Sequence, residues 1–419
     1  MTKLTIRPQP LGIFPLPAAY LVLPPADGAT ELQAALLHGN VPDSAPAALR
    51  FYPMALAGDL AGALSALFGD DTPEARYNRF VLRSDPAAYP ALRHEIDGDL
   101  ALLLELVAYT MGWSDAPPDP GDTNAELRAC ALSAQAAHAI EAGDLAKAEA
   151  TLVTAVDTAR PASPLLAAQL LGDLADVYVQ RSSPGPAALQ SLNQAITLLE
   201  GSGLHAARAQ LQLKLGMLYQ ELAYGQQRGA LLEAVRWYQE ALRVFTREQY
   251  PELYALAQNN LALAYLAMPL TEASDQLRMA IAVQALREAL KVYEPERYPE
   301  RWASAQLNLA NALQYLPSSH PQDNLAEAVE LYEQLLQTRD PAQDPNGYAR
   351  LLANQGNALA HLGIFKHARS KLQEAVRLFT TGGDNEAATA VHELLAAIVS
   401  HTAEQPQQEQ DGSIPTPTV

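Results

Sequence analysis

Between residues 136 and 375 the chain repeats one pattern of small and large apolar residues six times. Each copy opens with a small residue. Further along come an alanine, a large apolar residue four positions later and, in five of the six copies, a second alanine three positions after that. The opening residues are Ala136, Ala175, Gly216, Ala262, Ala310 and Gly356. Because spacings of four and three put side chains on one helical face, each copy predicts two helices packed along a shared face.

The later residues of each copy form a stripe in which small and large side chains alternate. These triplets are Ala148/Leu152/Ala155, Ala188/Leu192/Ala195, Ala234/Tyr238/Ala241, Ala282/Leu286/Ala289, Ala328/Tyr332/Leu335 and Ala368/Leu372/Ala375. Small residues let two helices approach closely while the large residue fills the gap. The copies recur every 39 to 48 residues, and a single helical pair cannot bury its outer face alone. The sequence therefore predicts an all-α fold of stacked helical hairpins.

The last copy resembles the tetratricopeptide repeat (TPR). Gly356 is followed there by Leu359, Gly363 and Phe365 and then by the final triplet, at the spacing of that repeat. Gly363 suits the turn between the two helices, and Phe365 starts the second helix. The resemblance covers roughly residues 124 to 400. It implies a right-handed α-solenoid whose first helices line a concave groove, and a protein that binds other proteins.

Two central copies, 48 residues apart, have closely matching sequences, including the segments Tyr250-Pro251-Glu252 and Tyr298-Pro299-Glu300. This longer period is similar to bacterial TPR arrays found beside signalling or protease modules, including caspase-like CHAT domains, and the likeness spans roughly residues 204 to 380. The middle copies carry polar or Pro/Gly/Ser-rich insertions, which we expect to form loops on one edge of the solenoid. They are residues 181–186, 224–229, 269–275 and 317–323.

Together with the repeat array, the other segments divide the chain into five predicted regions. Residues 1–28 are rich in proline, which predicts an extended strap or a short strand. Residues 29–123 predict helices, because Ala57-Gly58-Asp59-Leu60 echoes Ala142-Gly143-Asp144-Leu145 of the first copy. These helices are either degenerate repeats that cap the array or a separate ligand domain. The array follows at 124–385, then a capping helix at 386–400 and a disordered tail at 401–419, which is rich in Gln, Pro and Thr.

The net charge, the hydropathy and the cysteine content limit which partners the protein can bind and which compartment it can occupy. The net charge of −19, without a cluster of Lys or Arg, argues against nucleic acid. The sequence contains no run of 18 apolar residues, so it predicts no membrane-spanning helix. The single cysteine, Cys130, excludes an internal disulfide and indicates a reducing compartment, so we expect a cytoplasmic protein.

The sequence carries no motif that predicts catalysis. It has no phosphate-binding glycine loop with lysine, no G-x-S-x-G, no H-E-x-x-H and no C-x-x-C. The nine histidines are scattered, and the closest pair, His361 and His367, is six residues apart. We therefore expect no enzyme activity, no metal and no cofactor.

Positions at matching phase in the first helices point to a binding groove. Asparagine recurs there, and its side chain both donates and accepts hydrogen bonds, which suits the backbone of a bound peptide. The candidate residues are Asn260, Asn308, Asn311, Asn354, Asn357, Lys214, Gln210 and Arg350. The alternative role for these asparagines is to bond a neighbouring repeat and fix the superhelix. With Lys214 and Arg350 as the only cations on these rows, the pattern departs from the TPR subtype that grips a C-terminal carboxylate.

These observations predict an adaptor or regulatory subunit that binds another protein or a peptide in its groove. Two other functions stay open. One is a sensor that takes a small molecule or a signalling peptide in the groove, and the other is an enzyme with its site in residues 1–120. An open trough would favour the adaptor, and a closed pocket would favour the sensor.

Overall fold

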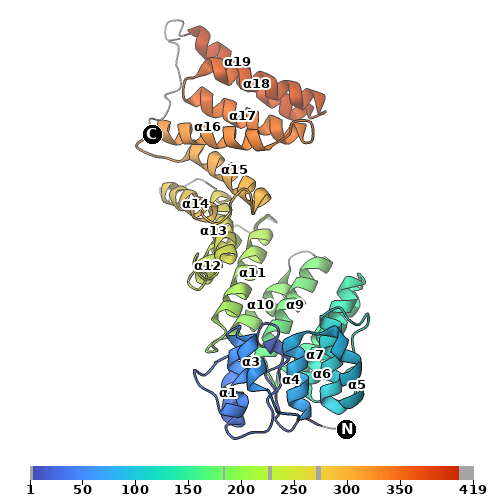
Figure 1. The fold of residues 1–419 in the computed structure, drawn as a ribbon. Helices are drawn as coiled ribbons and strands as arrows, with labels where there is room; N and C mark the ends of the chain where they lie inside the picture. The colour runs from blue at the N-terminus through green and yellow to red at the C-terminus, as the bar shows by residue number, and fades with distance from the viewer. Residues whose placement is uncertain (1–2, 183–184, 225–228, 270–274, 405–419) are drawn as a thin grey trace. The chain divides into compact units, whose positions relative to one another are not determined.

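The computed structural model describes residues 3–182, 185–224, 229–269 and 275–404 (Figure 1). These residues form nineteen α-helices and three short 3-10 helices, and no strand occurs among them. The chain divides into two compact units, Met1–Ala230 and Leu231–Val419. In each unit the helices of the array pack in succession, as in an α-solenoid of TPR-like repeats. The predicted fold class is thus confirmed.

Unit 1 begins with a segment that is mostly non-helical. Residues 3–28, which we call the strap, contain one 3-10 turn, η1 (Ala18–Tyr20). Short helices follow, and several of them begin beside or end before a proline or a glycine. They are α1 (Ala29–Leu37), η2 (Ala47–Leu49), α2 (Phe51–Leu56), α3 (Leu60–Ala66), α4 (Pro73–Arg83), η3 (Pro86–Ala88), α5 (Tyr89–Glu95) and α6 (Gly98–Thr110).

The strap is fixed to the helices by buried polar contacts. The amide of Asn78, on α4, donates to the carbonyl of Val22 at 2.8 Å and accepts from its N–H at 2.9 Å. Arg7 forms ion pairs with Asp99, at 2.5 Å, and with Glu126. Both carboxylates are almost fully buried, so the guanidinium neutralises charge that would otherwise be costly to hold there. The strap is therefore part of the fold of unit 1.

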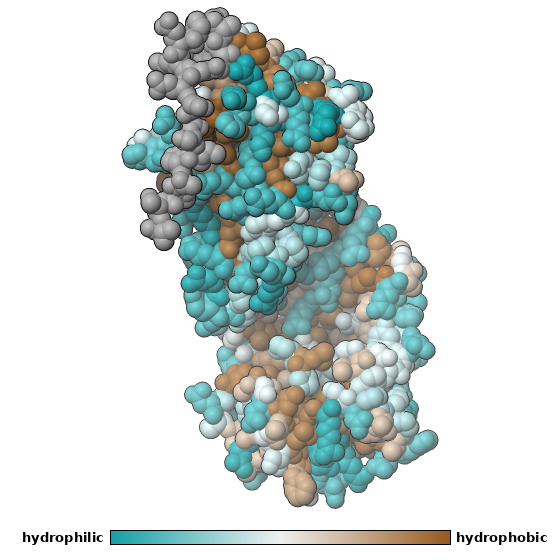
Figure 2. All heavy atoms as spheres, turned by 45° about the horizontal axis from the view of Figure 1, so that its top comes forward, coloured by the Kyte–Doolittle hydropathy of each residue, from teal (hydrophilic) through white to brown (hydrophobic). Residues whose placement is uncertain are grey.

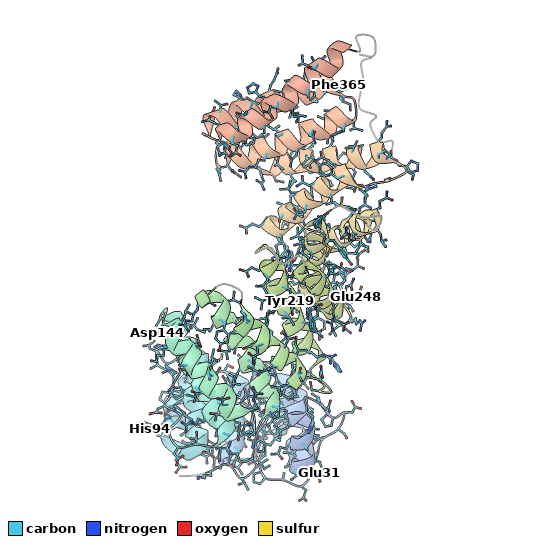
Figure 3. The ribbon with its side chains drawn as sticks, turned by 180° about the vertical axis from the view of Figure 1, so that it is seen from behind. Glu31, His94, Asp144, Tyr219, Glu248 and Phe365 are labelled. Carbon is cyan, nitrogen blue, oxygen red and sulfur yellow. The ribbon has the colours of Figure 1, made fainter. Side chains whose placement is uncertain are left out.

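The array in unit 1 comprises five longer helices, each in contact with the next. They are α7 (Ala125–Glu141), α8 (Leu145–Ala159), α9 (Pro164–Ser182), α10 (Pro186–Leu198) and α11 (His205–Tyr224). Ala136 and Ala175 are fully buried between helices, and Gly216 on α11 is buried too. Gly143 joins α7 to α8 with φ +76°, a conformation that favours glycine. Figure 3 labels Asp144 at this turn, where its carboxylate accepts from the Lys147 N–H at 3.0 Å and caps α8.

Unit 2 continues the pattern from α12 (Ala230–Leu242) onwards. Its further helices are α13 (Pro251–Leu266), α14 (Asp275–Leu290), α15 (Pro299–Tyr315), α16 (Pro321–Thr338), α17 (Pro345–His361), α18 (Phe365–Thr381) and α19 (Asn385–Glu404). From α13 to α19 each helix contacts the next, and α13 also contacts α15, as α17 contacts α19. The matching segments of the two central copies begin α13 and α15, each with proline at the first helical position after a tyrosine.

The opening residues of the later copies lie at close helix contacts. Ala262 and Ala310 have no solvent exposure. At Gly356 a β-carbon would come within 2.7 Å of Leu372 Cγ and 3.3 Å of the Ala368 carbonyl oxygen. The contact therefore joins α17 to the stripe on α18, which is the pairing expected for one helical hairpin.

Some predicted boundaries differ from the observed elements. The loop expected at 317–323 spans only 316–320, because α16 already begins at Pro321. Helix α19 runs to Glu404, four residues beyond the expected end of the capping helix. Of the other predicted loops, residues 183–184, 225–228 and 270–274 lie outside the described residues, as does the predicted tail from residue 405.

Apolar side chains remain on the surface as separate residues on different helices. On the face seen in Figure 2, hydrophobic and hydrophilic residues interleave. The most exposed large hydrophobic residues include Phe68, Leu232, Leu277 and Tyr315, which belong to different segments. Scattered exposure of this kind is ordinary for globular proteins. None of the described helices has the length and apolar character needed to cross a membrane.

Candidate functional site

The predicted groove asparagines of unit 2 lie half-buried on three first helices. They are Asn260 on α13, Asn308 and Asn311 on α15, and Asn354 and Asn357 on α17. Asn308 and Asn354 recur at one repeat position, as do Asn311 and Asn357. We call this row the amide face.

Part of the amide face is a hydrogen-bond network between neighbouring repeats. Asn354 Nδ2 donates to Asn311 Oδ1 at 3.1 Å, and Asn357 Nδ2 donates to Gln314 Oε1 at 3.1 Å. The hydroxyl of Tyr332, on α16, donates to Asn311 Oδ1 at 2.6 Å and accepts from Gln314 at 2.5 Å. Burial raises the pKa of Tyr332 well above its ordinary value, so the hydroxyl stays protonated and keeps donating. These contacts give Asn311, Asn354 and Asn357 the inter-repeat role.

The network leaves hydrogen-bonding capacity on the amide face. A side-chain amide has two N–H donors and a carbonyl oxygen with two lone pairs. The bonds above use both lone pairs of Asn311 Oδ1 but only one N–H each of Asn354 and Asn357. Asn260 is engaged more weakly, because its oxygen accepts from Asn259 at 3.4 Å. Among the described residues, the amide face therefore combines side chains of fixed orientation with donors and acceptors that the bonds above do not use.

Aromatic residues near the start of the first helices of unit 2 contact neighbouring helices. Trp302 and Tyr348 pack against the hydrophobic core of unit 2. The Tyr254 hydroxyl donates to Glu288 Oε2, on α14, at 3.1 Å. These contacts hold neighbouring helices together.

The predicted cations of the groove are paired with carboxylates. Lys214 Nζ, on α11, lies 2.6 Å from Asp176 Oδ2, on α9. Arg350, on α17, lies 3.6 Å from Asp384 Oδ2, near the start of α19. Gln210 is exposed on α11. Lys214 and Arg350 belong to different units, so the sequence-predicted site residues form two groups.

Unit 1 contains a cavity that the sequence did not predict, which we call the inner recess. It has a volume of about 720 Å³ and is walled by the strap, the end of α6, α7 and α9. Polar groups reach it from all four elements, among them Tyr20, Tyr109, Glu141 and Asp173. Glu141 and Asp173 remain exposed, so the recess is open to solvent. It is neither the closed pocket nor the plain trough considered from the sequence.

Carboxylates and protonated phenols give the inner recess its electrostatic character. Part of the Asp173 side chain is exposed, but three effects together raise its pKa from 3.8 to about 6: desolvation by the surrounding protein is the largest, Lys214 opposes the rise and Asp176 adds to it. Burial, with a smaller effect of Glu141, raises the pKa of Tyr109.

The cysteine of the recess is unsuited to nucleophilic chemistry. Burial, followed by the charge of Glu126, raises the pKa of the Cys130 thiol to about 12. The side chain is 6% exposed, and a thiol of this kind is a poor nucleophile at neutral pH. Within the described residues no group of three or more His, Cys, Asp or Glu side chains is placed to hold a metal ion.

Comparisons with known proteins find similarity of fold. No protein-family model matches the sequence, and no curated protein matches it. Among solved structures, the chain is similar to Cut9–Hcn1 of an APC/C hetero-tetramer at 15% identity and a TM-score of 0.42, over 89% of this chain and 63% of that one. It is similar to a signal transduction ATPase with a tetratricopeptide repeat sensor from Pyrococcus horikoshii at 13% identity and a TM-score of 0.49, over 82% and 48%.

A third similar structure is a Rap protein complexed with Competence and Sporulation Factor. Its identity to this chain is 14% and its TM-score 0.41, over 86% of this chain and 98% of that one. The chain spans less than two thirds of the length of the first two structures. These likenesses concern the fold alone.

Proposed function

We propose that this chain is a protein- or peptide-binding adaptor or regulatory subunit, and that the amide face of unit 2 holds its partner. The observation that carries this proposal is the network in which Asn311, Asn354 and Asn357 are held between α15 and α17. Side chains fixed in this way lose little conformational entropy when a ligand binds, which favours affinity.

A peptide backbone offers donors and acceptors in alternation, so its partner must supply both. Asparagine does so with a single side chain. The row from α13 to α17 repeats such groups at the spacing of the helices, which suits an extended or helical segment rather than a single point of contact. No catalytic step is required of this function. We propose a protein or peptide partner rather than nucleic acid, because the net charge of −19 would repel phosphates. We also propose a cytoplasmic location, which the single cysteine, Cys130, favours.

A peptide-display library selected against the full chain tests this function. Enriched peptides would be synthesised with a fluorescent label and titrated by anisotropy. The double variant Asn260→Ala/Asn308→Ala removes two amides of the face that lie outside the network above. We expect it to weaken binding by about tenfold or more, from the loss of two hydrogen bonds of about 1 kcal/mol each.

The matched control is Gln337→Ala, which removes an exposed amide from α16, a second helix. Circular dichroism would verify that helicity is kept. Peptides that bind the double variant as well as the unaltered chain, or a selection that enriches none, would contradict the proposal.

A further inference from the structure

We propose that the inner recess of unit 1 binds a small organic amine, with its ammonium group among the carboxylates and its apolar body against the aromatic wall. This site lies outside the amide face, and the proposal stands whether or not that face binds a peptide.

The size and walls of the recess suit a small molecule. About 720 Å³ is within the range of ligand sites that bury most of a drug-sized compound. Phe14 and Tyr20 of the strap, with Leu166 and Leu170 of α9, supply apolar and aromatic surface. Tyr20 is held in place because its hydroxyl lies 3.1 Å from Thr110 Oγ1. The strap is held at the recess by Gln169 of α9, whose amide donates to the Ile13 carbonyl at 2.9 Å.

The charge of the recess selects a cation. Asp115, Glu141 and Asp173 line it, and no lysine or arginine is among its described lining residues. The charge of Lys214 acts on Asp173, but Lys214 forms its ion pair with Asp176. Ammonium groups are attracted both by carboxylates and by the faces of aromatic rings.

A buried hydroxyl in the wall gives an independent reason to expect a ligand. The Tyr109 oxygen is shielded from solvent, and within the described residues it has no hydrogen-bond partner. Its ring packs edge-on against His138, with centroids 6.2 Å apart. A buried polar atom without a partner is unfavourable, and a protonated phenol can accept a hydrogen bond from an ammonium group. An amine in the recess would reach this atom after a rotation of the Tyr109 side chain that brings its oxygen to the surface of the recess.

Isothermal titration of the full chain with three amines tests the site. The probes are phenethylamine, tryptamine and spermidine, and phenethyl alcohol is the uncharged match of the first. The titrations are done at pH 8, where Asp173 is ionised. We expect at least one amine to bind with saturation below ~10 mM and the alcohol to bind about tenfold more weakly or not at all.

The variants Asp173→Asn and Glu141→Gln keep side-chain size while removing charge. Each should weaken amine binding by about five- to tenfold. The control Glu200→Gln removes a carboxylate elsewhere in unit 1, next to α10, and should leave binding unchanged. So should the amide-face double variant, which separates this proposal from the adaptor function. The absence of saturable binding of all three amines, equal binding of the alcohol, or unchanged binding by both carboxylate variants would overturn the proposal.

Discussion

Gly356 occupies a place in α17 where no side chain fits. A β-carbon at this residue would lie 2.7 Å from Leu372 Cγ and 3.3 Å from a backbone oxygen of α18, so a larger residue must push the two helices apart. We expect Gly356→Leu to lower the free energy of unfolding of unit 2 by about 1 to 3 kcal/mol, as overpacked sites do. Urea unfolding followed by far-ultraviolet circular dichroism would measure it.

The comparison for Gly356 is Arg350→Leu, at an exposed position of the same helix. Its ion pair with Asp384 is long, at 3.6 Å, and the Arg350 side chain is mostly exposed, so the loss should stay within about 0.5 kcal/mol. Equal stability of both variants would mean that α17 and α18 can separate at no cost.

Asp173 makes the stability of unit 1 depend on pH. Its pKa is raised from 3.8 to about 6, so the folded state holds the proton more tightly than the unfolded chain. Stability should therefore fall as the pH rises from about 4 to about 6. Lys214 limits the effect, while Asp176 adds to it, and Glu141 faces the same recess from α7.

The variant Asp173→Asn removes this titration. As the pH rises from about 4 to about 6, the unaltered chain should lose stability that the variant keeps. We therefore expect the melting temperature of the variant minus that of the unaltered chain to increase over this range and to level off above it. Scanning calorimetry at several pH values measures the difference. A difference that stays constant with pH would show that Asp173 titrates normally.

Among the elements, the strap depends most on a few polar contacts. The Asn78 side chain has no solvent exposure and satisfies both backbone groups of Val22. The variant Asn78→Ala leaves a buried N–H and a buried carbonyl without partners, each at a cost of about 1 to 3 kcal/mol. We expect unit 1 to lose about 2 to 6 kcal/mol of stability and the strap to become sensitive to proteases. Asn193→Ala is the control, because that amide is exposed and, among the described residues, bonds to the Leu189 carbonyl one turn earlier on its own helix.

The sequence predicted the helical pairs well because their signal is local. Residues that recur at spacings of three and four must share a helical face, and the burial of Ala136, Ala310 and Ala368 follows from that geometry. The prolines of residues 1–28 predicted an extended strap, but nothing in the sequence indicated where the strap packs or that an inner recess forms beside it. Both features depend on contacts between residues far apart in the chain, such as Gln169 with Ile13. The sequence also identified the row of asparagines. It could not predict their hydrogen-bond partners, because a side-chain amide can bond a ligand or a neighbouring repeat equally well.

At the largest scale, each unit owes its core to contacts between successive helices. In unit 2 the two central copies even repeat their details. Phe245 packs edge-on against Tyr250 with ring centroids 5.5 Å apart, and Tyr293 packs against Tyr298 in the same way at 5.8 Å. A link between the copies follows, because the Tyr298 hydroxyl donates to Glu252 Oε1 at 2.5 Å. Stability in such an array is close to a sum of repeat and neighbour terms.

An array of this kind should open from its end. Within the described part of the chain, the main contacts of helix α19 are with α18 and α17, both of which precede it, whereas α16 packs against α15 before it and α17 after it. We expect hydrogen exchange to be about tenfold or more faster in α19 than in α16, equivalent to a difference of about 1.4 kcal/mol in opening free energy. Mass spectrometry of peptides from both helices in the intact chain measures this ratio. Equal protection of the two helices would mean that unit 2 opens only as a whole, and the description of it as a sum of neighbouring contacts would then fail.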